Sequence, residues 1–188
     1  MLNICEPRLI RQIERPPTGG YPTVMGLSAA AAALAPAFIW RRIEGWIAWR
    51  WTERTVVWNV QGPGRWDFPL TPVKSITSTT TWDATNPPNF NTAVELEPTP
   101  FGLRLFDDGY FNIVAVVGDS TAVVPDDLKE AFRRLAEYLA QKSGRPGASV
   151  ESVKAGSVEV SVRRDPDFVA KALFSSGCAD LLRPYRTP

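Results

Sequence analysis

The sequence predicts an α+β protein: a small helical bundle with an inserted antiparallel β-sheet or sandwich and an extended C-terminal tail. Two stretches of the chain have apolar residues at helical spacing, and the region between them consists of short alternating runs separated by turns. The 188 residues suffice for one domain with a buried core. The 17 prolines exceed the average of about 5% and favour turns and strand edges over long helices.

The chain is expected to contain one domain with an extension at each end. Residues 1–25 are predicted to form an irregular N-terminal arm, because prolines and glycines between positions 16 and 22 interrupt any regular periodicity. Residues 26–174 are expected to form a single domain. Residues 175–188 follow it as a tail that is too short to build its own core.

Three helices are predicted within the domain, over about 28–50, 125–142 and 166–175. Ser28 can cap the first helix, and Pro36 kinks or restarts it. The second helix has the clearest amphipathic pattern in the chain. It begins with a proline and two aspartates, which suit a first helical turn and the positive end of the helix dipole.

The β insertion is predicted over residues 54–118. β-Branched residues dominate positions 55–60, and threonine and serine dominate positions 73–82. Asp107-Asp108-Gly109 forms a strong tight-turn signal between two alternating apolar runs. Five or six locally connected strands follow from this pattern, and they predict an antiparallel meander or a small sandwich.

The C-terminal tail combines apolar side chains with arginines. A short segment of this composition is expected to become ordered on binding a partner. The alternative is that the tail folds back onto its own domain. The residues concerned are Leu181, Leu182, Arg183, Tyr185 and Arg186.

The net charge of +1 conceals an uneven distribution along the chain. Residues 1–60 carry a net charge of +3, residues 61–127 carry −6, and residues 128–188 carry +4. The acidic region can simply be solvated. It can also meet the basic regions when copies assemble, or face nucleic acid that it must not grip.

The sequence offers no catalytic constellation. It contains no histidine, and its two cysteines, Cys5 and Cys178, lie at opposite ends without zinc-site spacing. Two unpaired thiols are favoured over a disulfide, which remains the alternative. Asp107 with Asp108 and Glu95 with Glu97 could suggest a metal site or an acid–base pair. A polar hairpin tip and a solvated strand face explain them better, so we expect no enzyme, metal or cofactor.

The seven tryptophans all lie between positions 40 and 82. Tryptophan beside Arg41, Arg42 and Arg50 could indicate a module that binds nucleic acid or a membrane surface. Packing of the rings against the following strands and neighbouring subunits is the favoured explanation. The stretch 26–40 is too short and too mildly apolar to span a membrane, and no apolar run near residue 1 suggests a signal peptide. A soluble protein is therefore expected.

Four segments form a more telling combination than any single motif. They are residues 51–58 (WTERTVVW), 62–66 (GPGRW), 124–131 (VPDDLKEA) and 176–186 (SGCADLLRPYR). Together they resemble the head–tail adaptor (connector) proteins of long-tailed phages (siphoviruses) and of gene transfer agents, over about residues 27–188. None of the segments is a catalytic signature.

The resemblance implies a structural protein of the virion neck, made in the cytoplasm of a bacterial host. A homo-oligomeric ring of twelve copies would bind the portal protein at the capsid vertex. A tail-side stopper or neck protein would dock below the ring. Genome DNA would pass through the channel without sequence specificity, and no membrane would be involved.

The resemblance also implies roles for particular residues. The C-terminal tail would bind the portal through Leu181, Leu182, Arg183, Tyr185 and Arg186. An acidic channel wall would let phosphates slide past by like charge, and the channel-facing candidates are Glu95, Glu97, Asp107 and Asp108. The candidates for the subunit interface are Trp46, Trp49, Arg50 and Trp51.

Overall fold

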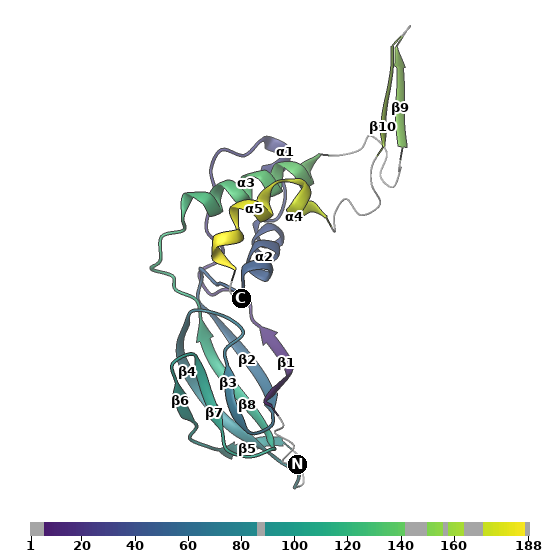
Figure 1. Cartoon of the computed structure of the whole chain (residues 1–188). Helices are drawn as coiled ribbons and strands as arrows, with labels where there is room; N and C mark the ends of the chain where they lie inside the picture. Colours follow the sequence, from purple (N-terminus) through teal and green to yellow (C-terminus); the bar gives the residue numbers. More distant parts are fainter. Residues whose placement is uncertain (1–5, 86–88, 142–149, 156–157, 164–170, 187–188) are drawn as a thin grey trace. The chain divides into compact units, whose positions relative to one another are not determined.

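The computed structural model describes residues 6–85, 89–141, 150–155, 158–163 and 171–186 (Figure 1). These residues fall into two compact units. The sheet unit comprises the described residues within 1–21 and 48–122. The helical unit comprises those within 22–47 and 123–188. The α+β class is confirmed.

The sheet unit contains two antiparallel sheets. The first has five strands in the order β1-β2-β8-β4-β5, and the second has three in the order β3-β7-β6. The strands are β1 (Arg8–Glu14), β2 (Arg54–Gln61), β3 (Gly64–Asp67), β4 (Val73–Asp83), β5 (Asn89–Ala93), β6 (Glu97–Thr99), β7 (Gly102–Leu105) and β8 (Tyr110–Val117). The predicted insertion over 54–118 therefore coincides with strands β2 to β8.

One hydrophobic cluster joins the two sheets into a sandwich. Strands β2 and β8 alternate strictly between buried and outward residues along their full length, as a half-buried strand must. Trp58 of β2 meets Trp66 of β3 with ring centroids 5.5 Å apart. Phe111 and Ile113 of β8 belong to the same cluster. Aromatic side chains thus supply much of the apolar area that holds the sandwich together.

The second sheet requires a glycine at the first position of its central strand, β7. A Cβ atom added to Gly102 would overlap the carbonyl oxygen of Trp66 on the neighbouring strand β3. This contact is with backbone, which a side-chain movement cannot relieve. Gly102 therefore sets how closely β3 and β7 approach one another.

Residues 1–25 are not wholly irregular, and that prediction is wrong for Arg8–Glu14. These residues form β1, an edge strand that pairs antiparallel with β2. The strand is nearly all exposed, so its apolar residues do not alternate in a way that marks a buried face. Long-range pairing with β2 and two side-chain contacts hold it in place, and local sequence does not encode either.

Glu14 provides one of these contacts at the end of β1. Its carboxylate accepts two hydrogen bonds from the Arg50 guanidinium, each of 2.8 Å, and lies 3.7 Å from Arg54. Arg50 and Arg54 are only 5% and 3% exposed. The bidentate geometry joins β1 to the segment before β2. The second contact is a 3.0 Å hydrogen bond from the Trp58 indole to Gln12.

The helical unit contains α1 (Ala29–Ala32), α2 (Pro36–Ile47), α3 (Asp126–Ala140), α4 (Ala172–Ser175), α5 (Cys178–Leu181) and the 3-10 turn η1 (Arg183–Tyr185). The predicted helices 28–50 and 125–142 correspond to α1 with α2 and to α3. Of the predicted helix 166–175, residues 166–170 lie outside the described residues. The hairpin of β9 (Val150–Ala155) and β10 (Val158–Arg163) is antiparallel.

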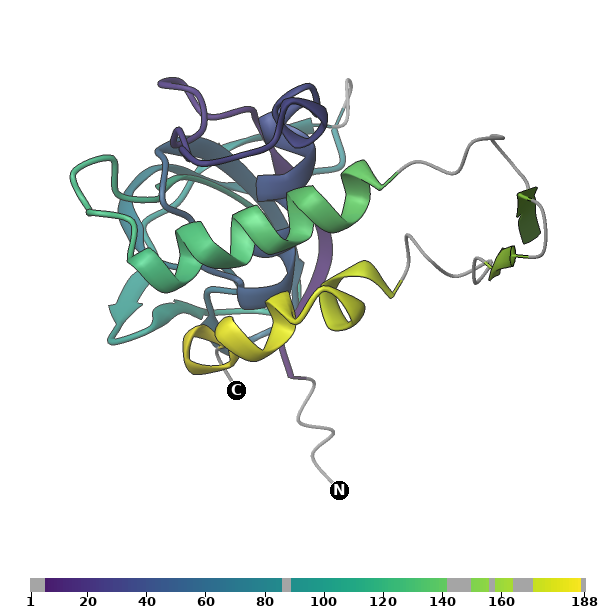
Figure 2. The same cartoon turned by 90° about the horizontal axis from the view of Figure 1, so that it is seen from above.

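α3 is the centre of the helical unit, since α1, α2, α4 and α5 all pack against it (Figures 1 and 2). Trp40 of α2 lies against Phe132 of α3 with ring centroids 5.1 Å apart. Ser28, which caps α1 as predicted, also donates its backbone N–H and its hydroxyl to Glu137 of α3. These two hydrogen bonds lower the pKa of Glu137.

The Glu14 cluster predicts a measurable pH dependence of stability. Burial raises the pKa of Glu14, but the hydrogen bonds from Arg50 and the charges of Arg50 and Arg54 outweigh it, so the pKa lies below its usual 4.5. The stabilisation is therefore present above pH 4.5 and is lost as the pH falls through the lowered value. We expect Glu14→Gln to lose about 2 kcal/mol at pH 7, because two buried guanidinium groups lose their anion.

Urea unfolding at a series of pH values measures this effect. The variant should show a flatter pH dependence than the natural protein below pH 4.5. Asp67→Asn is the matched control, because Asp67 pairs with Arg65 where both side chains are 54% exposed. Equal losses in the two variants would contradict a dominant role for the Glu14 cluster.

Candidate functional site

The C-terminal segment is folded onto the helical unit. α5 and η1 run beside α3, as both views show (Figures 1 and 2). Leu182 is 0% exposed, so this predicted portal-binding side chain offers no surface to a partner in the folded chain. Leu181 and Tyr185 are partly buried, and Arg183 and Arg186 are exposed. Residues 171–186 therefore fold back onto their own unit, which is the alternative that the sequence left open.

Two residues explain the path of this segment. Gly177 has a φ of 71°, which glycine adopts without strain, and it lets the chain turn between α4 and α5. Cys178 then begins α5 fully buried. Burial raises the pKa of the Cys178 thiol to about 12, although the positive charge of Arg134 opposes the shift. The thiol is therefore a packing group in the folded protein.

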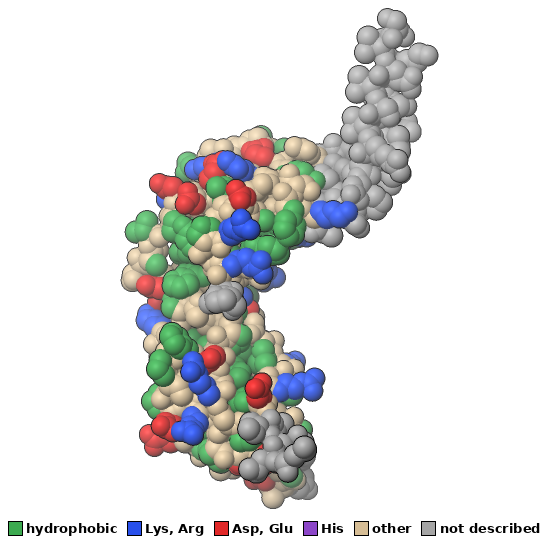
Figure 3. All heavy atoms as spheres, viewed as in Figure 1, with side chains coloured by type: hydrophobic (Ala, Val, Ile, Leu, Met, Phe, Trp, Pro, Cys, Tyr) green, Lys and Arg blue, Asp and Glu red, His purple; other side chains and the backbone are tan. Residues whose placement is uncertain are grey.

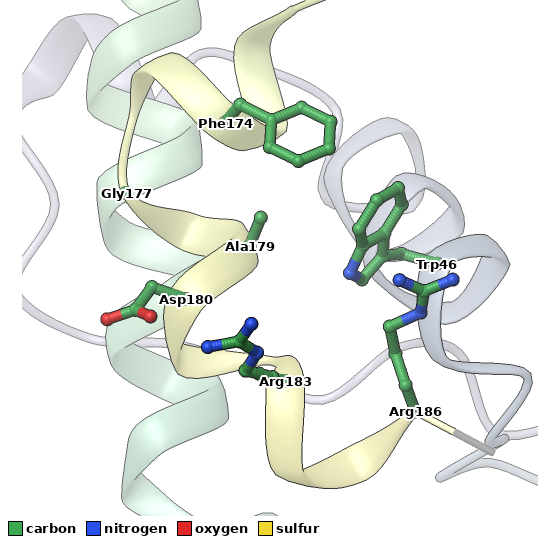
Figure 4. A pocket seen from close by; sticks show the side chains of 7 residues that line it. All are labelled: Trp46, Phe174, Gly177, Ala179, Asp180, Arg183 and Arg186. Carbon is green, nitrogen blue, oxygen red and sulfur yellow. The ribbon is translucent and has the colours of Figure 1, made fainter. Parts of the chain in front are cut away.

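A pocket of about 340 Å³ lies between α2 and the C-terminal segment (Figure 4). Trp46 of α2 forms one wall, Phe174 of α4 borders it, and the chain from Gly177 to Arg186 forms the rest. The full lining is Trp46, Phe174, Gly177, Ala179, Asp180, Arg183 and Arg186. The pocket thus brings together one candidate for the subunit interface and two predicted portal-binding residues.

The Trp46 ring is held between two neighbours. The Phe174 ring meets it edge-on with centroids 5.1 Å apart, and the Arg186 guanidinium lies 4.6 Å from the ring centroid. A guanidinium over an indole face is a favourable cation–π contact. In Figure 4 the indole nitrogen is on the side of the ring that faces α5 and Arg183.

The indole N–H of Trp46 is buried and has no acceptor. A buried tryptophan N–H usually finds a partner, and leaving it without one costs about 1–3 kcal/mol. Arg183 makes no ion pair with any residue that the structure describes. Asp180 is the single acidic residue of the lining. The pocket therefore offers more hydrogen-bond donors and positive charge than it satisfies.

The other candidates for the subunit interface belong to the sheet unit. Trp49 is partly exposed and stacks at a tilt on Trp51, with centroids 5.7 Å apart, and Trp51 is buried. Arg50 is buried against Glu14. Of these three, only Trp49 has substantial exposed surface for a partner.

The channel-facing candidates lie on the sheet unit. Glu95 and Glu97 line a second hollow of about 490 Å³, in which Glu97 lies 3.8 Å from Arg104. Asp107 and Asp108 are exposed in the β7–β8 turn, where Asp107 accepts a 2.9 Å hydrogen bond from the Gly109 N–H. Acidic side chains alternate with lysine and arginine on the face shown in Figure 3. That face is mixed in charge.

The sequence did not indicate Phe174 or Asp180 as site residues. Phe174 is 64% exposed. The sequence feature that could have indicated this exposure is that Phe174 lies off the apolar face of the predicted last helix. No three histidine, cysteine, aspartate or glutamate residues cluster for a metal among the described residues. In the same part of the chain, every helix is too short or too polar to cross a bilayer.

Comparisons with known proteins identify a shared fold. No family model and no curated protein matches the chain. A chain in the solved virion of a native gene transfer agent (GTA) particle superimposes with a TM-score of 0.52 at 20% identity, covering 87% of this chain and 80% of that one. The overall fold of this protein is therefore that of a virion chain.

Two further solved chains are less similar. One is from the neck of a native GTA particle computed with C12 symmetry, with a TM-score of 0.49 at 18% identity, covering 86% of this chain and 84% of that one. The other is from the neck of an empty GTA particle computed with C6 symmetry, with a TM-score of 0.49 at 17% identity, covering 89% and 96%. Both scores fall below the similarity that establishes a common fold.

The buried thiol gives a direct test of the folded C-terminal segment. Because its pKa is about 12, Cys178 should not react with iodoacetamide at pH 8 in the native protein. It should react readily in 6 M guanidinium chloride. Mass spectrometry of the peptide that contains Cys178 measures the modification. Rapid labelling under native conditions would contradict the burial of this segment.

Proposed function

We propose that this chain is a structural head–tail adaptor that forms a ring at the neck of a phage-like particle. The observation that carries the proposal is the fold, which matches a chain of a GTA virion over 87% of this protein. The sequence resemblance to head–tail adaptors over residues 27–188 supports the same conclusion independently.

The surface of the chain also suits protein–protein contact. Large apolar side chains are exposed on both units, including Phe101 and Phe106 on the sheet unit and Phe174 on the helical unit. Exposed aromatic residues are typical of surfaces that are covered on assembly. A ring of twelve copies would cover such side chains, and its channel would conduct genome DNA past Glu95, Glu97, Asp107 and Asp108.

In this proposal the C-terminal segment contacts the portal as a folded surface. Leu182 is committed to the core, so the partly exposed Tyr185 and Leu181 are the apolar groups of this segment that remain available to the portal. Burial and the nearby charge of Asp127 raise the pKa of Tyr185, so its hydroxyl stays protonated at neutral pH. A tail-side stopper or neck protein would dock on the opposite end of the ring.

The alternative is a module that binds nucleic acid or a membrane surface through the Trp/Arg-rich helix. Two observations disfavour it. Arg50 is bound to Glu14 in the interior, and Arg42 lies over the Phe38 ring at 4.7 Å. Trp40 and Trp51 are buried, so they offer no stacking platform.

Mass photometry with portal rings of the same particle tests the proposed function. Addition of this protein should raise the mass of the portal peak by twelve copies of 20.8 kDa. A variant that lacks residues 183–188 keeps the buried Leu182 and Cys178, and it should fold but bind the portal at least about tenfold more weakly. Removal of residues 187–188 alone is the control. An unchanged portal peak with the full-length protein would overturn the adaptor proposal.

A further inference from the structure

We propose that the pocket lined by Trp46, Arg183 and Arg186 receives the β7–β8 turn, residues 106–109, of a second copy of this chain. The proposal rests on the proposed ring and specifies one contact that builds it. The pocket belongs to the helical unit and the turn to the sheet unit. Each copy therefore carries both halves of the contact.

The pocket is built to accept a carboxylate beside an aromatic ring. The Trp46 indole N–H is buried without an acceptor, and Arg183 has no ion pair among the described residues. An incoming carboxylate can accept from the exposed Arg183 guanidinium, and hydrogen bonds between charged groups are stronger than neutral ones. The Trp46 N–H has almost no accessible surface in the isolated chain, so the carboxylate reaches it only when the ring moves on binding. Phe174 is 64% exposed at the edge of the pocket, where a second aromatic ring can cover it.

The β7–β8 turn has the complementary features. Phe106 is 58% exposed and is followed directly by two exposed aspartates. Asp107 uses one oxygen for the Gly109 N–H, and Asp108 has no hydrogen bond or ion pair within the described chain. Among the described residues, Trp82 is another exposed aromatic residue that directly precedes an acidic residue. That acidic residue, Asp83, already accepts a hydrogen bond from the Thr85 N–H.

The contact joins two different surfaces, so it repeats from copy to copy. Such a head-to-tail contact generates a ring when the rotation between copies closes. The local charges favour it, because the turn carries Asp107 and Asp108, whereas the pocket lining carries Arg183 and Arg186 against Asp180 alone. Opposite charges at the contact accelerate the encounter and fix its orientation.

Charge reversal on each side tests the contact. The pocket variant carries Arg183→Glu and Arg186→Glu, and the turn variant carries Asp107→Lys and Asp108→Lys. Each variant alone juxtaposes like charges, so its self-association should weaken at least about tenfold. In an equimolar mixture every pocket can face a turn of opposite charge if the two variants alternate. The mixture, and a chain with all four changes, should associate at least about threefold more tightly than either variant alone, but less tightly than the unaltered chain, because lysine cannot accept from the Trp46 N–H.

Sedimentation velocity without portal and mass photometry on portal rings measure the outcome. Arg8→Glu with Arg11→Glu on exposed β1 is the matched control for charge, and it should associate normally. Failure of the mixture and of the fourfold variant to recover would overturn the proposal. If the pocket variant alone loses portal binding and the turn variant does not, the arginines face the portal. That result would overturn this contact while leaving the adaptor function intact.

The Trp46 indole gives a second readout that a general loss of folding does not imitate. The probe is an acetylated, amidated peptide with the sequence of residues 104–111, and its control carries asparagine at both aspartate positions. The ¹H–¹⁵N signal of the Trp46 indole, assigned with Trp46→Phe, should move downfield with the aspartate peptide only. No shift with the aspartate peptide, or equal shifts with both, would overturn the proposal. The Trp46 indole signal could already lie downfield in a dilute monomer without peptide and return upfield in the turn variant. That result would mean that the turn occupies the pocket of its own copy, and it would also overturn the proposal.

Discussion

The burial of Cys178 and Leu182 is the constraint on which the candidate site depends. With both side chains in the interior of the helical unit, α5 is held against α3 and η1 continues directly from it. Arg183 and Arg186 then lie on the outer side of this segment, opposite Trp46 (Figure 4). The backbone that carries the two arginines is therefore held in position before any partner arrives, and Arg186 is also held by the Trp46 ring. A partner that meets a preorganised surface does not have to order it, and the affinity it can reach is correspondingly higher.

The sheet unit satisfies its own constraints separately. Its two sheets share one aromatic-rich cluster, and the Glu14 carboxylate neutralises charge on buried arginines that would otherwise destabilise the unit. The unit can therefore present the β7–β8 turn rigidly, since both flanking strands belong to that cluster through Leu105 and Phe111. Each of the two surfaces in the proposed contact is thus supported by a different core.

The sequence predicted those elements whose signals are local. Alternation in β2 and β8, the turn at residues 107–109 and the proline-aspartate start of α3 are each readable within about ten residues. β1 was missed because an exposed edge strand is stabilised by pairing with a distant part of the chain. Every residue of β1 that pairs with β2 lies more than forty positions before its partner, as Arg8 does before Gln61. The pair Leu181-Leu182 gives the same sequence pattern whether it contacts a partner or its own core. The pocket unites residues 46, 174, 183 and 186, and no sequence spacing indicates that α2 meets the end of the chain there.

The unsatisfied Trp46 N–H has a physical meaning in an assembling subunit. A protein that binds no partner at this site gains nothing from the Trp46 N–H. An apolar ring of similar shape would keep the contacts with Phe174 and Arg186 and would not leave a donor without an acceptor. In the proposed contact a second copy supplies the acceptor, and the isolated subunit would be only an intermediate in assembly, so the cost of the donor would be removed in the ring. The same cost discourages other occupants, since an apolar side chain in the pocket would leave the N–H and Arg183 without partners. A donor that is unsatisfied in the monomer thus favours a carboxylate over other groups that could fill the same volume.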